Sequence, residues 1–188
     1  MENHIDLRVQ KTHILIHHAF TELMEEKGFE GFTVGELCER AMIRRATFYK
    51  HFSDKYAYFN FYMNEIFRSF HGRLKPGMEA GDVNEYALHI CRELIRFTKE
   101  HERFFKKAME ASVAPTTLTI LLEVLHSDIR HALQNAPGSK ELSGDQLEGR
   151  AYFFTGGVLS ILFRHLQSST PIDEDAFMDV VSAFLFPE

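Results

Sequence analysis

Apolar residues recur along this chain at intervals of three and four, the spacing that places them on one face of an α-helix. Alternation of apolar and polar residues, which is typical of a half-buried strand, is not convincing in any segment. The pattern predicts an all-α protein with helices at about 8–27, 33–41, 44–52, 53–73, 83–99, 101–112, 115–135, 146–168 and 173–186.

Helix-breaking residues separate these segments. Gly28 can end the first helix, and Lys75-Pro76-Gly77 is expected to end the fourth, which Ser53 can cap at its start. Three helices within residues 1–55 therefore precede a larger helical part at 56–188, and we interpret the two parts as domains.

The second and third predicted helices have the spacing of a helix-turn-helix. Thr33 is a good N-cap, and Glu36 three residues later can complete a capping box with it. Ala41-Met42-Ile43 forms the expected turn, and Phe48 and Phe52 are expected to face the core. A helix that follows such a turn can enter the major groove of DNA.

The charge pattern supports this interpretation. Residues 40–55 hold five Lys or Arg against Asp54 alone, a net charge of +4, whereas the whole chain has a net charge of −6. An acidic protein needs a local positive patch to bind a polyphosphate. A short Arg/Lys run is often only a solvated helix face, but here it coincides with the helix-turn-helix pattern and with Tyr49 and His51, both suited to phosphate contact.

Residues 14–55 resemble the DNA-binding domain of the TetR family of bacterial transcriptional regulators. The matching residues are Ala19-Phe20, Leu23, Lys27-Gly28-Phe29, Thr33-Val34, Ala41, Ile43, the run 47–52, and Lys55. Met42 stands where the family often has Gly, which implies that the turn has ordinary dihedral angles or mild strain. Arg44 stands where a small polar residue often caps the recognition helix, so it is freer to reach a base or a phosphate.

The resemblance implies a ligand-responsive repressor that binds a palindromic operator in double-stranded DNA as a homodimer. The base readers carried over by position are Arg44, Arg45 and Thr47. The phosphate contacts carried over by position are Thr33, Tyr49, Lys50, His51 and Lys55.

The dimer contact is expected in the last two helices. Segment 152–163 is apolar nearly all round and contains Gly156-Gly157, which weaken a helix unless they allow another helix to approach closely. The expected interface residues are Phe153, Gly156, Gly157, Ser160, Phe163, Phe177, Val181 and Phe184. The alternative is that this segment belongs to an intrachain core.

A ligand site in the second domain is expected mainly because the family resemblance implies one. A cavity for a small apolar or aromatic effector could be lined by Tyr86, His89, Phe97, Phe105, Met109, Leu122, Phe153 and Phe154. The alternative is that this aromatic stripe is an ordinary helical core.

Neither a membrane segment nor a secretory signal is indicated. No window approaches the roughly 20 apolar residues of a membrane span, and the amino end lacks the apolar core of a signal peptide. A cytoplasmic protein without membrane contact is therefore expected, in which Cys38 is a packed free thiol.

Catalysis and metal binding find little support in the sequence. His13 with His17, or His126 with Asp128, could ligate a metal, but neither pair has a third ligand, so exposed helix-face histidines are expected instead. No cofactor and no enzymatic activity are expected. Two alternatives stay open: a helical co-regulator that acts through a protein partner, and an enzyme that uses His89.

Overall fold

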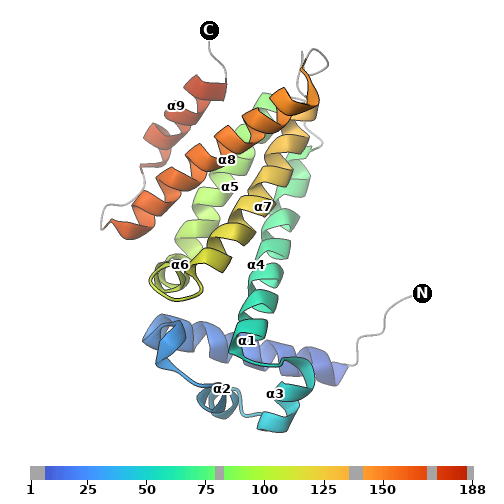
Figure 1. The fold of residues 1–188 in the computed structure, drawn as a ribbon, viewed down its shortest axis with the longest axis vertical. Coiled ribbons are helices and arrows are strands. Elements are labelled where there is room, and N and C mark those ends of the chain that lie inside the picture. The colour runs from blue at the N-terminus through green and yellow to red at the C-terminus, as the bar shows by residue number, and fades with distance from the viewer. Residues whose placement is uncertain (1–6, 79–82, 136–141, 169–172, 186–188) are drawn as a thin grey trace, which may run out of the picture. The chain divides into compact units, whose positions relative to one another are not determined.

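The computed structural model describes residues 7–78, 83–135, 142–168 and 173–185, and within these residues the regular secondary structure is helical, without strands (Figure 1). The elements are α1 (Leu7–Lys27), η1 (Phe29–Gly31), α2 (Val34–Arg40), α3 (Arg45–His51), α4 (Lys55–Met78), α5 (Val83–Glu100), α6 (Glu102–Met109), α7 (Ala114–Gln134), α8 (Gly144–Gln167) and α9 (Glu174–Leu185). The predicted all-α class is confirmed.

The chain forms two compact units. The first comprises Met1–Asn64 together with Arg103–Thr117, and the second comprises Glu65–Glu102 together with Leu118–Glu188. The first unit thus extends beyond residue 55 and includes a segment from the middle of the chain. A functional boundary at residue 55 stays a prediction.

Aromatic rings make up much of the core of the first unit. The ring of Phe20 on α1 lies 4.9 Å from that of Tyr58 and 5.1 Å from that of Tyr62, both on α4. Phe104 on α6 is fully buried, and its ring lies 4.9 Å from Tyr62 and 6.3 Å from Phe59. Burying rings of this size is a large share of what stabilises a small helical unit, and edge-to-face packing adds to it.

Polar contacts also tie α6 and the residues after it to α1, η1 and α4. The carboxylate of Glu30 accepts a hydrogen bond of 2.8 Å from the backbone N–H of Ser112. The Ser112 hydroxyl lies 3.3 Å from the Tyr56 hydroxyl, and Arg103 lies 3.7 Å from Glu25. Segment 103–117 is therefore an integral part of the first unit.

In the second unit α5 packs against both α8 and α9. The ring of Phe97 on α5 lies 5.2 Å from Phe70 on α4, and both side chains are fully buried. Arg73 pairs with Glu100 at 2.6 Å, and Lys99 lies 3.4 Å from Glu174 at the start of α9. The core is therefore apolar, and ion pairs lie at its margin.

Two predicted details of α4 are wrong. The helix continues through Pro76 to Met78, where we expected it to end at residues 75–77. A proline removes one helical hydrogen bond, and this loss matters little where the helix ends within the same turn. The start is capped by Asp54 rather than Ser53, because an Asp54 carboxylate oxygen accepts the backbone N–H of Ala57 at 2.7 Å.

Both cysteines, Cys38 and Cys91, are buried and free, as expected for Cys38. Burial raises the pKa of the Cys91 thiol to about 12, so this thiol is unreactive at neutral pH. Among the described residues, no helix is long and apolar enough to cross a membrane.

Candidate functional site

The helix-turn-helix begins at the predicted capping box of α2. The Thr33 hydroxyl accepts the Glu36 backbone N–H at 3.2 Å, and a Glu36 carboxylate oxygen accepts the Thr33 backbone N–H at 2.8 Å. Lys27 donates to the other Glu36 oxygen at 2.8 Å. The hydrogen bond from Lys27, followed by those from Thr33, lowers the pKa of Glu36 from 4.5 to about 2. The capping box is therefore confirmed, and a salt bridge to the end of α1 reinforces it.

The turn after α2 is a Schellman motif with methionine at the position that favours glycine. The Ile43 N–H donates to the Cys38 carbonyl at 2.9 Å, and the Met42 N–H donates to the Glu39 carbonyl at 3.1 Å. Met42 has a φ of 53°, in the left-handed region. Of the two conformations expected for this turn, the strained one is present.

Helix α3 presents a polar face and buries its aromatic residues. Phe48 and Phe52 are 0% and 8% exposed, which confirms the prediction that they face the core. Among the predicted DNA contacts, the side chains of Arg44, Arg45, Tyr49, Lys50 and Thr33 are exposed, and those of Thr47 and His51 are half-buried. The structure therefore brings these side chains to the outside of one helix-turn-helix.

Three of the five basic residues in segment 40–55 already have partners. Arg40 is bound by Glu22 at 3.1 Å and by Glu26 at 2.9 Å. Arg45 lies 4.0 Å from Glu39. Arg44 and Lys50 have no ion-pair partner among the described residues. The charge available to a phosphate backbone is therefore smaller than the net +4 of the sequence indicates.

Lys55 is the third of these basic residues. Its ammonium group donates hydrogen bonds to the backbone carbonyls of Phe29 and Phe32. The sequence offered no signal for this arrangement, because the two carbonyls belong to η1 and the loop after it. The role of Lys55 at a phosphate stays a prediction, and in this structure its charge faces into the first unit.

The histidines that we expected on exposed helix faces are packed against other residues. The His13 ring lies 5.3 Å from that of His51 on α3, and the His17 ring lies 4.5 Å from that of Tyr62. His126 lies 3.2 Å from Glu148, whereas Asp128 lies 3.3 Å from His71. The expectation of exposure is wrong for His13, His17 and His126, because the rings of His51, Tyr62 and Tyr152, respectively, lie against them. Within the described residues, no group of three or more His, Cys, Asp or Glu could hold a metal ion.

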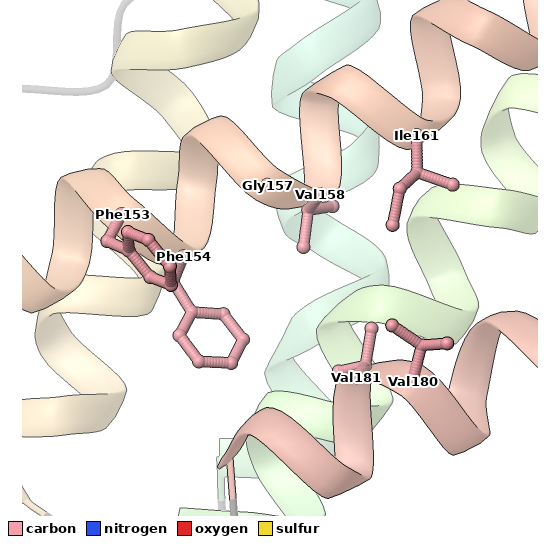
Figure 2. A pocket seen from close by; sticks show the side chains of 7 residues that line it. All are labelled: Phe153, Phe154, Gly157, Val158, Ile161, Val180 and Val181. Atoms are coloured by element: carbon pink, nitrogen blue, oxygen red, sulfur yellow. The ribbon is translucent and has the colours of Figure 1, made fainter.

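The second unit has an apolar hollow between α8 and α9, with a volume of about 140 Å³ (Figure 2). Its lining residues are Phe153, Phe154, Gly157, Val158, Ile161, Val180 and Val181. The Phe153 side chain is 73% exposed, and a Cβ added at Gly156 or Gly157 would meet no atom within 4 Å. This face of α8 is therefore apolar and uncovered in the single chain.

The other predicted interface residues differ in burial. Phe177 and Val181 are buried, Phe163 is half-buried and Ser160 is exposed. The Ser160 hydroxyl donates to the Gly156 carbonyl of its own helix at 2.7 Å. The side chain of Phe184 lies outside the described residues.

Of the eight residues predicted to line a ligand pocket, Phe153 and Phe154 line this hollow. Phe105 and Met109 belong to the first unit, and the remaining six belong to the second. The Phe97, Phe105 and Tyr86 side chains are buried, Leu122 is 37% exposed, and Met109 is half-buried. His89 is half-buried too, with Nε2 3.4 Å from the Arg73 carbonyl. A volume of about 140 Å³ is also below the roughly 300–1,000 Å³ of typical ligand pockets.

A capped helix-turn-helix with an exposed polar second helix is the arrangement by which many DNA-binding proteins present a helix to the major groove. A family model described as "Bacterial regulatory proteins, tetR family" matches residues 16–60. The HTH-type transcriptional regulator YxbF of Bacillus subtilis, itself uncharacterized, is 38% identical over 55 residues. Those residues are 29% of this chain and 14% of YxbF, so the match spans a small part of that relative.

Solved structures are similar over nearly the whole chain. The fatty acid degradation regulator FadR from Bacillus halodurans has a TM-score of 0.70 at 16% identity, covering 92% of this chain and 93% of that one. NalD, the secondary repressor of the MexAB-OprM multidrug efflux pump in Pseudomonas aeruginosa, has a TM-score of 0.68 at 16% identity, covering 92% of this chain and 93% of that one. The dihydroxyacetone kinase operon activator DhaS has a TM-score of 0.62 at 15% identity, covering 93% of each chain. At these identities the likeness concerns the fold.

Residues 16–60 therefore match the tetR family of bacterial regulatory proteins, and nearly the whole chain is similar in fold to these solved regulators.

Proposed function

We propose that this protein is a repressor that binds a palindromic DNA operator as a homodimer. The observation that carries the proposal is the outward face of α3, where Arg44, Tyr49 and Lys50 are exposed while Phe48 anchors the same helix in the core. A short helix held in this way can enter the major groove and keep its polar side chains at the bases and phosphates.

Each exposed residue has a role suited to its chemistry. Arg44 and Arg45 lie at the start of α3, from which a guanidinium can pair with a guanine, and the Thr47 methyl can touch a thymine. Tyr49 and Lys50 would bind phosphate oxygens and set the register of the helix in the groove. Thr33 and His51 are further phosphate contacts in this proposal.

Dimerisation is supported by the uncovered apolar face of α8 and α9. Phe153 and Val180 are 73% and 45% exposed, and such a continuous apolar patch usually marks an interface. The flanking charges are complementary, because Arg150 and Arg164 on α8 are exposed, as is Asp179 on α9. A two-fold axis between two copies would bring α8 of each chain against α9 of the other and pair these opposite charges.

A second copy also explains how a short recognition helix becomes specific. Two such helices spaced about 34–36 Å apart read half-sites in successive major grooves. Such a dimer represses by occupying promoter DNA and needs no contact with the polymerase. The similar folds of NalD, a repressor, and DhaS, an activator, are compatible with either direction.

We also propose that a small apolar or aromatic effector controls DNA binding. The fold neighbours include a regulator of fatty acid degradation and a repressor of a multidrug efflux pump. An effector would act by favouring a conformation whose two heads no longer match the operator spacing. DNA binding would place the protein in the cytoplasm, and the proposal includes no catalytic step.

The alternative is a co-regulator that acts mainly through a protein partner. Its support is the net charge of −6 and the internal engagement of Arg40 and Lys55. Such a protein would bind DNA weakly and without base preference.

Selection from a random duplex pool at moderate salt tests the proposal. We expect enrichment of a palindrome with half-sites about one helical turn apart. No enrichment by a folded dimer would support the co-regulator instead. Phe153→Asp should yield monomers in analytical ultracentrifugation and lose operator binding, whereas Ile14→Asp, at a 56% exposed position on α1, should leave the dimer intact.

A further inference from the structure

Gly35 on α2 lies directly under the guanidinium of Arg45, the first residue of α3. A Cβ built on Gly35 would lie 2.9 Å from Cζ of Arg45 and 3.3 Å from its Nε, and closer still to Nη2. Separations under 3.0 Å are closer than van der Waals contact allows, so any larger residue at position 35 must displace the guanidinium.

The backbone gives no other reason for glycine at this position. Among the described glycines, Gly28 has a positive φ, and Gly35 is in an ordinary helical conformation. Glycine is a poor helix former, so alanine would make α2 more stable. What the missing side chain provides is room for the flat guanidinium group against the helix backbone.

Glu39 completes this binding surface for Arg45. It lies one helical turn after Gly35, on the same face of α2, and its carboxylate is 4.0 Å from Nη2 of Arg45. The Arg45 side chain remains 68% exposed. The guanidinium therefore lies over Gly35 and near Glu39, while most of the Arg45 side chain stays available to a base.

We propose that Gly35 is a positioning residue for DNA reading, because its missing side chain sets the direction in which Arg45 reaches the operator. The proposal rests on the base-reading role of Arg45 in the proposed function. An ordered arginine forms the paired hydrogen bonds to a guanine at a lower entropic cost than a mobile one. Position 35 would thus influence base preference without itself touching a base.

The test compares Gly35→Ala with Gly72→Ala, a helical glycine at which an added Cβ would meet no atom within 4 Å. Affinity and base preference are measured on the selected operator and on all its single-base variants. For Gly35→Ala we expect a loss on the order of tenfold in affinity and a weakened preference at one base pair of each half-site. Its melting temperature should be unchanged or higher, and Gly72→Ala should bind as the wild type does.

A double-mutant cycle with Arg45→Ala separates the inference from the function on which it rests. If Gly35 acts through Arg45, Gly35→Ala has no further effect in the Arg45→Ala background. A further loss in that background would indicate a direct clash with DNA and overturn the inference, as would unchanged or tighter binding by Gly35→Ala alone. If Arg45→Ala alone changes neither affinity nor base preference, the base-reading role of Arg45 is itself wrong.

Discussion

The ammonium group of Lys55 donates a hydrogen bond of 2.6 Å to the backbone carbonyl of Phe32. It also lies 4.4 Å from the ring centroid of Phe29 and 4.6 Å from that of Phe32. Partial burial lowers the pKa of Lys55, and the nearby Glu30 and Glu36 oppose this effect. Lys55 thus links the start of α4 to η1 and to the loop that precedes α2.

Lys55→Met should destabilise the first unit by about 2 kcal/mol, because it removes charged hydrogen bonds and leaves two carbonyls without a donor. Urea unfolding followed by circular dichroism measures this loss. Lys50→Met is the matched control, since Lys50 is exposed, and its stability should stay within about 0.5 kcal/mol of the wild type. Equal stabilities of the two variants would show that the internal contacts of Lys55 contribute nothing.

The salt dependence of operator binding should distinguish basic residues that meet phosphates from those that are paired internally. Lys50→Ala should lower the slope of log affinity against log salt by about one unit. Arg40→Ala should leave the slope unchanged, because Glu22 and Glu26 already bind that guanidinium. Equal slope changes in the two variants would mean that Arg40 leaves its partners to contact DNA.

Met42→Gly should stabilise the protein by about 0.5–1 kcal/mol. The left-handed backbone at Met42 costs about 1–2 kcal/mol for a residue with a Cβ, and the greater freedom of glycine in the unfolded chain offsets part of the gain. The side chain is 84% exposed, so its removal costs little packing. Met42→Ala keeps the Cβ and should show no gain in the same urea titration.

Acid should weaken the start of α2 in a defined range of pH. Because the pKa of Glu36 falls from 4.5 in the unfolded chain to about 2 in the folded protein, its contribution is complete above pH 4.5. That contribution is lost as the pH falls toward 2. Glu36→Gln keeps a capping acceptor but cannot titrate, so its stability should vary less between pH 4.5 and 2 in urea titrations. Identical pH profiles for variant and wild type would contradict this expectation.

Phe104→Ala should cost about 3–5 kcal/mol of stability, because it leaves a cavity among the rings of Phe20, Phe59 and Tyr62. Thermal unfolding should show the loss. Tyr152→Ala is a suitable comparison, because that ring is 51% exposed and a much smaller cost is expected. A similar small cost for Phe104→Ala would show that α6 contributes little to the core of the first unit.

Local features of the helix-turn-helix could be read from the sequence. The capping box needs only a Thr followed three residues later by a Glu, and Phe48 and Phe52 repeat at the spacing of one helix face. The sequence pattern places the cap of α4 one residue too early, because the neighbours Ser53 and Asp54 are both good N-caps. Such errors arise where two neighbouring residues have equal capping preferences, because tertiary packing then decides which of them caps the helix.

The partners of charged groups could not be predicted in the same way. Arg40 binds Glu22 and Glu26, and Lys55 binds carbonyls in and after η1, all of them far away in sequence. Periodicity assigns a residue to a face of its own helix, but it does not say which other helix faces it. The sequence alone therefore overestimates the positive charge that segment 40–55 can offer to DNA.

The inclusion of segment 103–117 in the first unit limits how this chain can be recombined with proteins of similar fold. A hybrid made by one crossover near residue 64 would keep Phe20 and Tyr62 but take its α6 from a foreign chain. The packing of the Phe104 ring against Phe20 and the hydrogen bond from the Ser112 N–H to Glu30 would then form only if the foreign segment happened to be complementary. The first unit consists of two stretches of sequence that must be exchanged together, so a single crossover would produce chimeras in which this unit is unstable.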